Sequence, residues 1–445
     1  MKEERFYRLL KEKKYVDIKK ELSEMNSVDV AERLGELDPE TRLLIFRTLP
    51  KDLAVEVFAS FSREDQEEIL NIITEQELNH ILDEIFFDDM IDMIEEMPAN
   101  IVNKILENSS VEERRLINQF LKYPVDSAGT IMTIEYVELR QEMTVAEALD
   151  HIKEIGLTKE TIYTCYVTNN NRILEGIISL RTLVIENEDM KISELMEKDV
   201  IYVNTHDDQE KVANVFNRYR FLALPVVDNE HRLTGIITVD DVMDVMEQEA
   251  TEDFQRMAAI EPVEDAYLDT GVFHLARKRF VWLLILMISA ILTEGIINRF
   301  EETISKVVAL IAFMPMLMDT GGNGGSQSST LIIRGLALGE ITLKDTWKVL
   351  WKEFRVSIVV GVSLAALNFL KNMYFDKVGF AVSITVSVTL IFTIMISKVV
   401  GGMLPLVAER LNMDPAMMAG PLITTIVDAL ALIVYFSMAT VMLGI

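Results

Sequence analysis

One carboxylate lies inside the last apolar stretch of the chain. The sequence GPLITTIVDALALIVYFSMA, residues 420–439, has the composition of a membrane helix, yet it contains Asp428 and no Lys or Arg. A charged group at the centre of a bilayer helix costs roughly 2.5–3.5 kcal/mol, so it normally faces water, an ion or a partner. Thr424 lies one helical turn earlier on the same face, which predicts a wet, cation-attracting stripe along this helix.

A second polar segment, MDTGGNGGSQSSTLIIRG, occupies residues 318–335 of another apolar stretch. Its glycines and polar residues should break a helix that faces lipid, because the freed backbone groups would find no water there. Close packing through small residues is an alternative that explains the glycines. It does not explain the polar side chains, so we expect a polar path lined by Asn323, Ser326 and Thr330, with Asp319 as a second candidate acid.

Five apolar segments could carry these residues across a membrane, since a hydrocarbon core of ~30 Å needs ~20 residues of helix. They are residues 280–298, 305–338, 354–371, 378–405 and 418–444. Lys and Arg are more frequent in the loops on the side of the N-terminus, which predicts that the N-terminus is inside and the C-terminus outside. Glu294 and Lys398 also lie within these segments, and a purely structural pairing of either with Asp428 is the alternative to an ion path.

Charge and hydrophobicity are segregated along the chain. Of its 445 residues, 50% are hydrophobic and 26% are charged, with a formal net charge of −28. The whole acid excess precedes residue 271, which disfavours nucleic acid or anionic lipid as the partner of that part and favours cations. One cysteine, Cys165, excludes an intrachain disulfide and reads as a buried strand position.

The first residues contain no apolar core of signal-peptide length, so we expect the N-terminal part in the cytoplasm. The chain has five histidines, and we find no embedded pair of nucleophile and base. An enzyme is therefore not expected.

Helix-start residues recur at intervals of about twelve in the first quarter of the chain, which predicts serial short helices stacked as a superhelix. These residues are Asp38, Pro50, Ser62, Thr74, Phe86, Pro98 and Ser110. Such an array is a scaffold, and we find no catalytic pattern in it.

Two segments of strand and helix then repeat at a separation of about sixty residues. Each has a hairpin, NNNR or DNEHR, before a strand GIIS or GIIT, and the pair resembles tandem CBS domains over residues 126–248. The resemblance implies a nucleotide half-site at Thr238 and Asp241, whereas the first repeat has Ser179 and Thr182 there. A dimerising sensor without nucleotide is the alternative. An acidic segment of helical period, Asp240–Asp269, then leads to the membrane part.

The order of these parts resembles the MgtE-type magnesium channels over nearly the whole chain. The most specific pieces are TGGNGGSQSSTLIIRGLA (320–337), MLPLVAERLNMDPAMMAGPL (403–422) with the following TTIVDA, and GIITVDDVMDVMEQEATED (235–253). The resemblance implies a multidomain fold. Its parts are an all-α superhelical N-terminal domain (1–124), an α/β tandem CBS pair (125–248), a connecting helix of plug type (249–273) and a five-helix α transmembrane pore domain (274–445).

The resemblance also implies the function, a Mg²⁺-selective channel for Mg²⁺ uptake at the inner cell membrane, gated closed by cytosolic Mg²⁺. It implies a homodimer in a lipid bilayer with a pore on the two-fold axis, a selectivity carboxylate at Asp428, and ATP or another adenine nucleotide at the CBS pair. The regulatory Mg²⁺ ligands that it implies are Asp88, Asp89, Asp92, Asp208, Glu210, Asp241, Asp244, Glu249, Glu252, Asp253 and Asp414. The rival function is a proton-coupled divalent-cation carrier, because lone carboxylates in spans also serve proton relays.

Three positions depart from the family pattern. Family members commonly have Asn where this chain has Ser326 and Gly420, and an acid where it has Arg220. We expect altered geometry near the inner mouth of the pore and one weaker sensor site.

Overall fold

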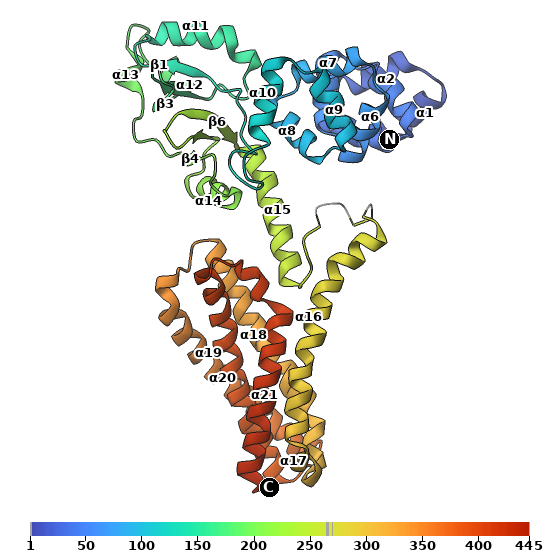
Figure 1. Cartoon of the computed structure of the whole chain (residues 1–445), viewed down its shortest axis with the longest axis vertical. Helices are drawn as coiled ribbons and strands as arrows, with labels where there is room; N and C mark the ends of the chain where they lie inside the picture. The colour runs from blue at the N-terminus through green and yellow to red at the C-terminus, as the bar shows by residue number, and fades with distance from the viewer. Residues whose placement is uncertain (1, 264–266, 269, 445) are drawn as a thin grey trace. The chain divides into compact units, whose positions relative to one another are not determined.

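A computed structural model gives the structure of residues 2–263, 267–268 and 270–444 (Figure 1). It forms two compact units, Met1–Met246 and Glu247–Ile445. The first unit contains an array of helices followed by two small sheets, and the second contains the long apolar helices.

The array consists of short helices that begin at the predicted residues. Asp38, Ser62, Thr74 and Ser110 each accept a hydrogen bond on the side chain from a backbone N–H of the first turn, which satisfies one of its free donors. Each helix buries one apolar face in a continuous core. The helices are α1 (Lys2–Lys11), α2 (Tyr15–Leu22), α3 (Ser27–Gly35), α4 (Pro39–Phe46), α5 (Lys51–Ala59), α6 (Arg63–Ile72), α7 (Glu75–Glu84), α8 (Phe87–Glu96), α9 (Ala99–Asn108) and α10 (Val111–Phe120).

The two repeats each form a three-stranded sheet, parallel and then antiparallel, in the orders β1-β2-β3 and β4-β5-β6. Cys165 is buried in its strand, as predicted. The first repeat has β1 (Glu138–Arg140), α11 (Val145–Ile155), β2 (Thr164–Thr168), β3 (Leu174–Ser179), α12 (Leu180–Ile185) and α13 (Ile192–Leu195). The second has β4 (Val203–Asn204), α14 (Gln209–Tyr219), β5 (Ala223–Val227), β6 (Leu233–Thr238) and α15 (Val239–Met257).

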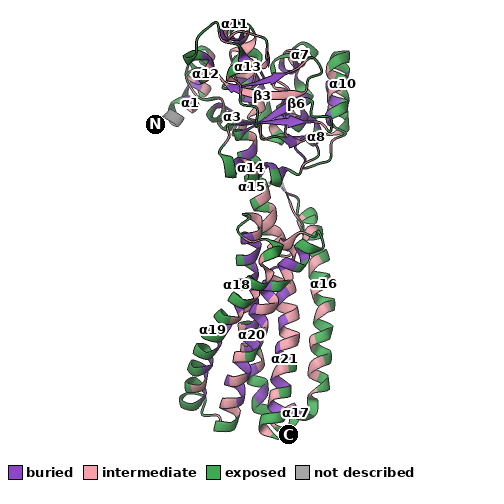
Figure 2. Ribbon diagram, turned by 90° about the vertical axis from the view of Figure 1, so that its left-hand side faces the viewer, coloured by how far each residue is buried: buried purple, intermediate pink, exposed green. Residues whose placement is uncertain are grey.

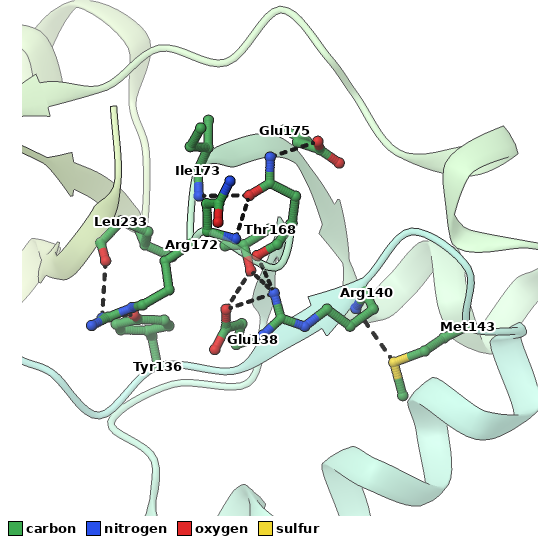
Figure 3. A network of polar contacts seen from close by, with 11 residues as sticks. Tyr136, Glu138, Arg140, Met143, Thr168, Arg172, Ile173, Glu175 and Leu233 are labelled. Atoms are coloured by element: carbon green, nitrogen blue, oxygen red, sulfur yellow. Dashed lines mark hydrogen bonds and ion pairs between the residues drawn. The ribbon is translucent and has the colours of Figure 1, made fainter. Parts of the chain in front are cut away.

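The two predicted hairpins join the repeats to each other. Arg172 and His231 occupy equivalent turn positions with φ of 62° and 61°. The Arg172 side chain donates to the Leu233 carbonyl oxygen at 3.0 Å and to the Tyr136 hydroxyl at 3.1 Å (Figure 3). The Arg172 carbonyl in turn accepts from the Leu233 N–H at 2.8 Å, so one arginine ties the hairpin of the first repeat to the last strand of the second.

The connecting segment differs from the prediction of a helix over 249–273. α15 is one helix that starts at the end of the second sheet and ends at Met257, and the described residues between 258 and 271 are not helical. Residues 264–266 and Asp269, which the expected connector includes, lie outside the described residues.

The second unit contains five long helices, which are α16 (Val272–Arg299), α18 (Met314–Ala337), α19 (Thr346–Tyr374), α20 (Phe380–Arg410) and α21 (Gly420–Leu443), with a short α17 (Glu301–Lys306) between the first two. Among the described residues, four helices are long and apolar enough to cross a membrane. They are α16, α19, α20 and α21. α18 has 24 residues and the polar segment. Buried residues lie along α18, α19, α20 and α21, whereas α16, which is described completely, has none (Figure 2).

Candidate functional site

The glycine-rich segment does not interrupt its helix. α18 is continuous through all of its glycines, which corrects the expectation of irregular backbone. A Cβ on Gly322 would lie 2.8 Å from Thr424 Cγ2, and one on Gly325 would lie 2.6 Å from Ile423 Cγ2. The backbone of Gly401 on α20 lies directly against the Gly325 carbonyl. The glycines therefore serve close helix packing, the alternative that the sequence had left open.

Because the glycines face α20 and α21, the polar residues of α18 point elsewhere. Asp319, Asn323, Gln327 and Thr330 are exposed at spacings of four, four and three residues, which puts them on one face of the helix. Ser326, at the edge of this polar stripe, is half-buried. Asn323 and Thr330 therefore lie on a common open face of α18, and their place along a polar path stays a prediction.

Asp428 lies on α21 beside a cavity of about 320 Å³. Two carboxylates line this cavity, Asp428 and Glu294 of α16, together with Thr293 and Thr425. Asp319 of the polar stripe is near enough to Asp428 for the two charges to interact. Three acids from three helices therefore surround the same part of the unit.

Thr424, the threonine predicted beside Asp428, has its hydroxyl bonded within its own helix. Its hydroxyl donates to the Pro421 carbonyl at 2.8 Å, and its methyl group contacts Gly322. Thr425, which also donates to Pro421, is the threonine that lines the cavity. Glu294 had been considered only as a structural partner of Asp428, and the signal that could have identified it is its own position as an acid in an apolar helix.

Lys398 does not neutralise Asp428. Its ammonium group lies 3.5 Å from the Gly324 carbonyl oxygen and 3.4 Å from the Ser328 hydroxyl, on the packed side of α18. The structure therefore does not contain the alternative pairing of Lys398 with Asp428.

In the first unit, acids from three elements meet. Asp88 and Asp89 of α8, Asp241 of α15 and Glu160 interact through their charges. Burial, and then the charges of Asp241, Asp89 and Glu160, raise the pKa of Asp88 to about 9. Burial, and then the charges of Asp241 and Asp240, raise the pKa of Glu160 to about 7 and that of Asp89 to about 6. Glu160 was not predicted, since nothing in its local sequence distinguishes it from a surface acid.

The other predicted regulatory acids of this unit lie on α8, on α15 and at the start of α14. Asp92 lies one turn beyond Asp88 on α8, and Asp244 lies on α15, where its charge acts on Asp241. Asp208 and Glu210 lie at the start of α14 instead, where the Asp208 side chain accepts from the Glu210 N–H at 2.9 Å. Asp208 therefore has a local role as a helix cap.

The end of α15 belongs to the second unit and carries its own acids. Burial, and then the charges of Asp414 and Glu249, raise the pKa of Asp253 to about 6. An arginine that was not predicted lies among them, because Arg256 forms ion pairs with both Glu252 and Asp414. The four predicted carboxylates of this region, Glu249, Glu252, Asp253 and Asp414, are thus close together. Arg256 forms ion pairs with two of them.

The comparisons with known proteins bear on all of these parts. Residues 314–438 match a family described as a divalent cation transporter, MgtE, residues 25–126 match the MgtE intracellular N domain, and residues 128–187 and 192–248 match CBS domains. The magnesium transporter MgtE of Thermus thermophilus is 36% identical over 95% of this chain and 94% of its own length. The chain belongs to the MgtE family.

Other MgtE proteins support the same assignment. The magnesium transporter MgtE of Bacillus subtilis is 33% identical over 97% of this chain and 95% of its own. The solved cytosolic domain of the Mg²⁺ channel MgtE in complex with ATP is similar with a TM-score of 0.51 and 36% identity, over 54% of this chain and 98% of that one. The protein is thus a membrane-spanning member of a magnesium transporter family with CBS domains, and it is not an enzyme.

In the part of this MgtE protein that the structure describes, acids come together without forming a closed metal cage. Within the described residues, no three His, Cys, Asp or Glu side chains converge tightly enough to hold a metal ion. The acids of α8 and α15, of which Asp88 is buried, nevertheless have the oxygen donors that Mg²⁺ prefers. Mg²⁺ usually keeps several waters and uses one or two carboxylates, so a site of this kind needs fewer direct ligands.

The expected nucleotide residues of this MgtE protein are bonded to each other. The Thr238 hydroxyl donates to Asp241 Oδ2 at 2.5 Å, and Asp241 lies among the acids of α8. In the first repeat the equivalent Ser179 and Thr182 hydroxyls are 2.9 Å apart. Asp241 is therefore shared between the predicted nucleotide half-site and the acidic cluster.

Proposed function

We propose that this protein is a magnesium-selective channel whose filter contains Asp428. The observation that carries this proposal is the open polar stripe of α18 beside the Asp428 cavity, in a chain of a magnesium transporter family. Hydrated Mg²⁺ suits carboxylates and hydroxyls that bind through water. In a homodimer with a two-fold axis along this stripe, two copies of Asp428 would attract the ion, with Asn323, Ser326 and Thr330 along its path.

We infer the orientation from the loops. The N-terminal array and the CBS pair face the cytoplasm and the C-terminus faces the outside of the inner membrane, because the more basic loops stay inside. The match to an intracellular N domain supports the first half of this orientation.

We further propose that cytosolic Mg²⁺ closes the channel. Binding near Asp88, Asp89 and Asp241 would neutralise acids that otherwise repel one another at low dielectric. The ion must bind the closed state more tightly than the open one, since otherwise it shifts no population. ATP at the CBS pair, near Thr238 and Asp241, is proposed as a second ligand because a relative was solved with ATP.

The test is Mg²⁺ uptake into vesicles that contain the full-length protein. We expect Asp428→Asn to reduce uptake at least tenfold, because the amide cannot supply the charge that attracts a divalent ion. Asp376→Asn is the matched control, since Asp376 is an exposed loop acid that pairs with Lys371. Normal uptake by Asp428→Asn would contradict the assignment of Asp428 to the filter.

The same vesicles separate a channel from a proton-coupled carrier. A channel passes Mg²⁺ at a rate set by the magnesium gradient and the voltage, and continues when a protonophore has collapsed the proton gradient. Uptake that stops with the proton gradient would favour the carrier.

A further inference from the structure

Two charged residues are buried in the core of the membrane unit. Glu353 of α19 is 8% exposed and Lys398 of α20 is 5% exposed. Ser328 of α18, at 1% exposure, lies between them. Ionisable residues inside membrane bundles are rare and usually have a function, because an uncompensated charge there is costly.

The three side chains form a connected chain of polar contacts. The Ser328 hydroxyl donates to Glu353 Oε2 at 2.6 Å, a short bond to an anionic acceptor. The Lys398 ammonium lies 3.4 Å from the same hydroxyl oxygen and 3.5 Å from the Gly324 carbonyl oxygen. Both charges are thereby connected to α18, one through a donated and one through an accepted contact.

The packing around this chain leaves room for the acid. A Cβ on Gly402 of α20 would lie 3.2 Å from Glu353 Cγ, so a glycine at this position admits the glutamate side chain between the helices. Gly401, the preceding residue, lies directly against the Gly325 carbonyl of α18. α18, α19 and α20 therefore meet at one level, with Ser328 as the residue of α18 that both charges contact.

This contact fixes which face of α18 is open. At 3.6 residues per turn, Asn323 and Thr330 lie about 140° and 160° around the helix from Ser328. A helix anchored at Ser328 on its packed side thus presents Asn323 and Thr330 on its opposite side, where both are exposed. The glycines allow close packing, and the carbonyl oxygens of Gly321 and Gly324 accept from Ser397 and Lys398 of α20. Ser328 adds the side-chain contact of α18 with both buried charges.

We propose that Lys398 and Glu353 are positioning residues of the permeation path, and that they hold α18 through Ser328 at the rotation that exposes Asn323 and Thr330. This inference rests on the proposed function, because it assumes that the polar stripe faces the path. Lys398 and Glu353 touch no ion in this role, and act only through α18.

The test measures the rotation of α18 in the full-length protein. Asn323→Cys is introduced into a Cys165→Ala background, which removes the single native cysteine. The rate of its modification by a water-soluble methanethiosulfonate is then measured in membranes, together with Mg²⁺ uptake. In this parent protein we expect rapid modification that blocks uptake.

Adding Lys398→Met should slow modification of Asn323→Cys at least fivefold and reduce uptake. Lys352→Met is the matched control, since Lys352 is an exposed lysine beside Glu353 and should leave both rates unchanged. Unchanged rates in a Lys398→Met protein that reaches the membrane would overturn the positioning role. A parent Asn323→Cys that is never modified would overturn the proposed path, and this inference with it.

If Lys398→Met does not assemble, a charge-swapped pair tests the positioning role instead. Glu353→Lys combined with Lys398→Glu keeps the buried charges balanced, and Ser328 can still accept from the lysine and donate to the glutamate. We expect this pair to recover at least half of the parent modification rate and uptake. A swapped protein that assembles but stays as slow as Lys398→Met would contradict the inference.

Discussion

Asp88 illustrates how a carboxylate can be kept ready for a cation. Its burial, and its neighbours Asp241, Asp89 and Glu160, raise its pKa to about 9, so the metal-free folded protein holds a proton there at neutral pH. A divalent ion supplies the positive charge that the proton otherwise supplies. Binding of Mg²⁺ at this cluster should therefore release protons and should strengthen as pH rises.

The titration of Asp88 predicts a pH-dependent stability. An unfolded aspartate has a pKa of about 3.9, so between that pH and about 9 the folded state holds a proton that the unfolded state has lost. The free energy of unfolding therefore falls as pH rises through this window. In EDTA at pH 8, we expect Asp88→Asn to raise the thermal unfolding midpoint by at least ~2 °C, with a smaller effect at pH 6.

The measurement is thermal unfolding of the full-length protein in detergent, followed by circular dichroism. Asp83→Asn, a change at an exposed acid of α7, is the matched control and should alter neither midpoint. Added Mg²⁺ should raise the midpoint of the unchanged protein and have less effect on Asp88→Asn. Equal pH dependence in both proteins would show that Asp88 is ionised in the fold.

At the scale of elements, local signals predicted the helices of the array but not their partners. Asp38, Thr74 and Ser110 cap their helices at the expected positions, because a cap depends only on a side chain and the first helical turn. α18 was expected to break because its glycines and polar residues would leave backbone groups without water in lipid. Contacts of Gly325 with α20 and α21 stabilise it, and those contacts depend on residues far away in the chain.

The candidate sites show the same division. Asp428 could be identified from the cost of a charge in an apolar stretch, and the acidic positions of α8 and α15 from the family resemblance. Glu160 and Arg256 could not, because an acid or arginine in a polar segment is ordinary until tertiary structure gives it neighbours.

Arg256 gives a prediction for the end of α15. It already pairs with Glu252 and Asp414, so a metal ion that uses these acids must displace it. We expect Arg256→Gln to lower several-fold the cytosolic Mg²⁺ concentration that half-inhibits uptake. Without the arginine, Glu252 and Asp414 are no longer paired and can bind the metal ion. Flux into vesicles with Mg²⁺ varied on the CBS side measures this.

Arg410→Gln is the control for Arg256→Gln, since Arg410 is exposed at the end of α20. A half-inhibiting concentration that rises in Arg256→Gln would indicate the opposite role for Arg256. The ion pair itself would then hold the closed state.

For the whole molecule, the division of charge between the two units indicates different functions: regulation in the acidic unit and permeation in the membrane unit. The net charge of −28 comes from the cytosolic part, whereas the membrane part carries the predicted filter. α15 belongs to both, because it begins after β6 in the first unit and ends at Met257 in the second. Under the proposed gating, α15 is the continuous helix through which a change in the acidic unit would act on the membrane unit.

Removal of residues 1–124 tests whether the acidic unit regulates the membrane unit. It deletes Asp88 and Asp89, so Asp241 and Glu160 lose two of the acids that a cation would neutralise, while Asp428 and the polar stripe remain. We expect the truncated protein to take up Mg²⁺ at a rate that cytosolic Mg²⁺ no longer reduces. Full-length Asp88→Asn combined with Asp89→Asn should lose inhibition in the same direction, since it removes the same charges without removing the array. Inhibition that persists unchanged in both proteins would put the magnesium sensor elsewhere, at the acids around Arg256, because those are the other predicted ligands that the truncation leaves intact and close together.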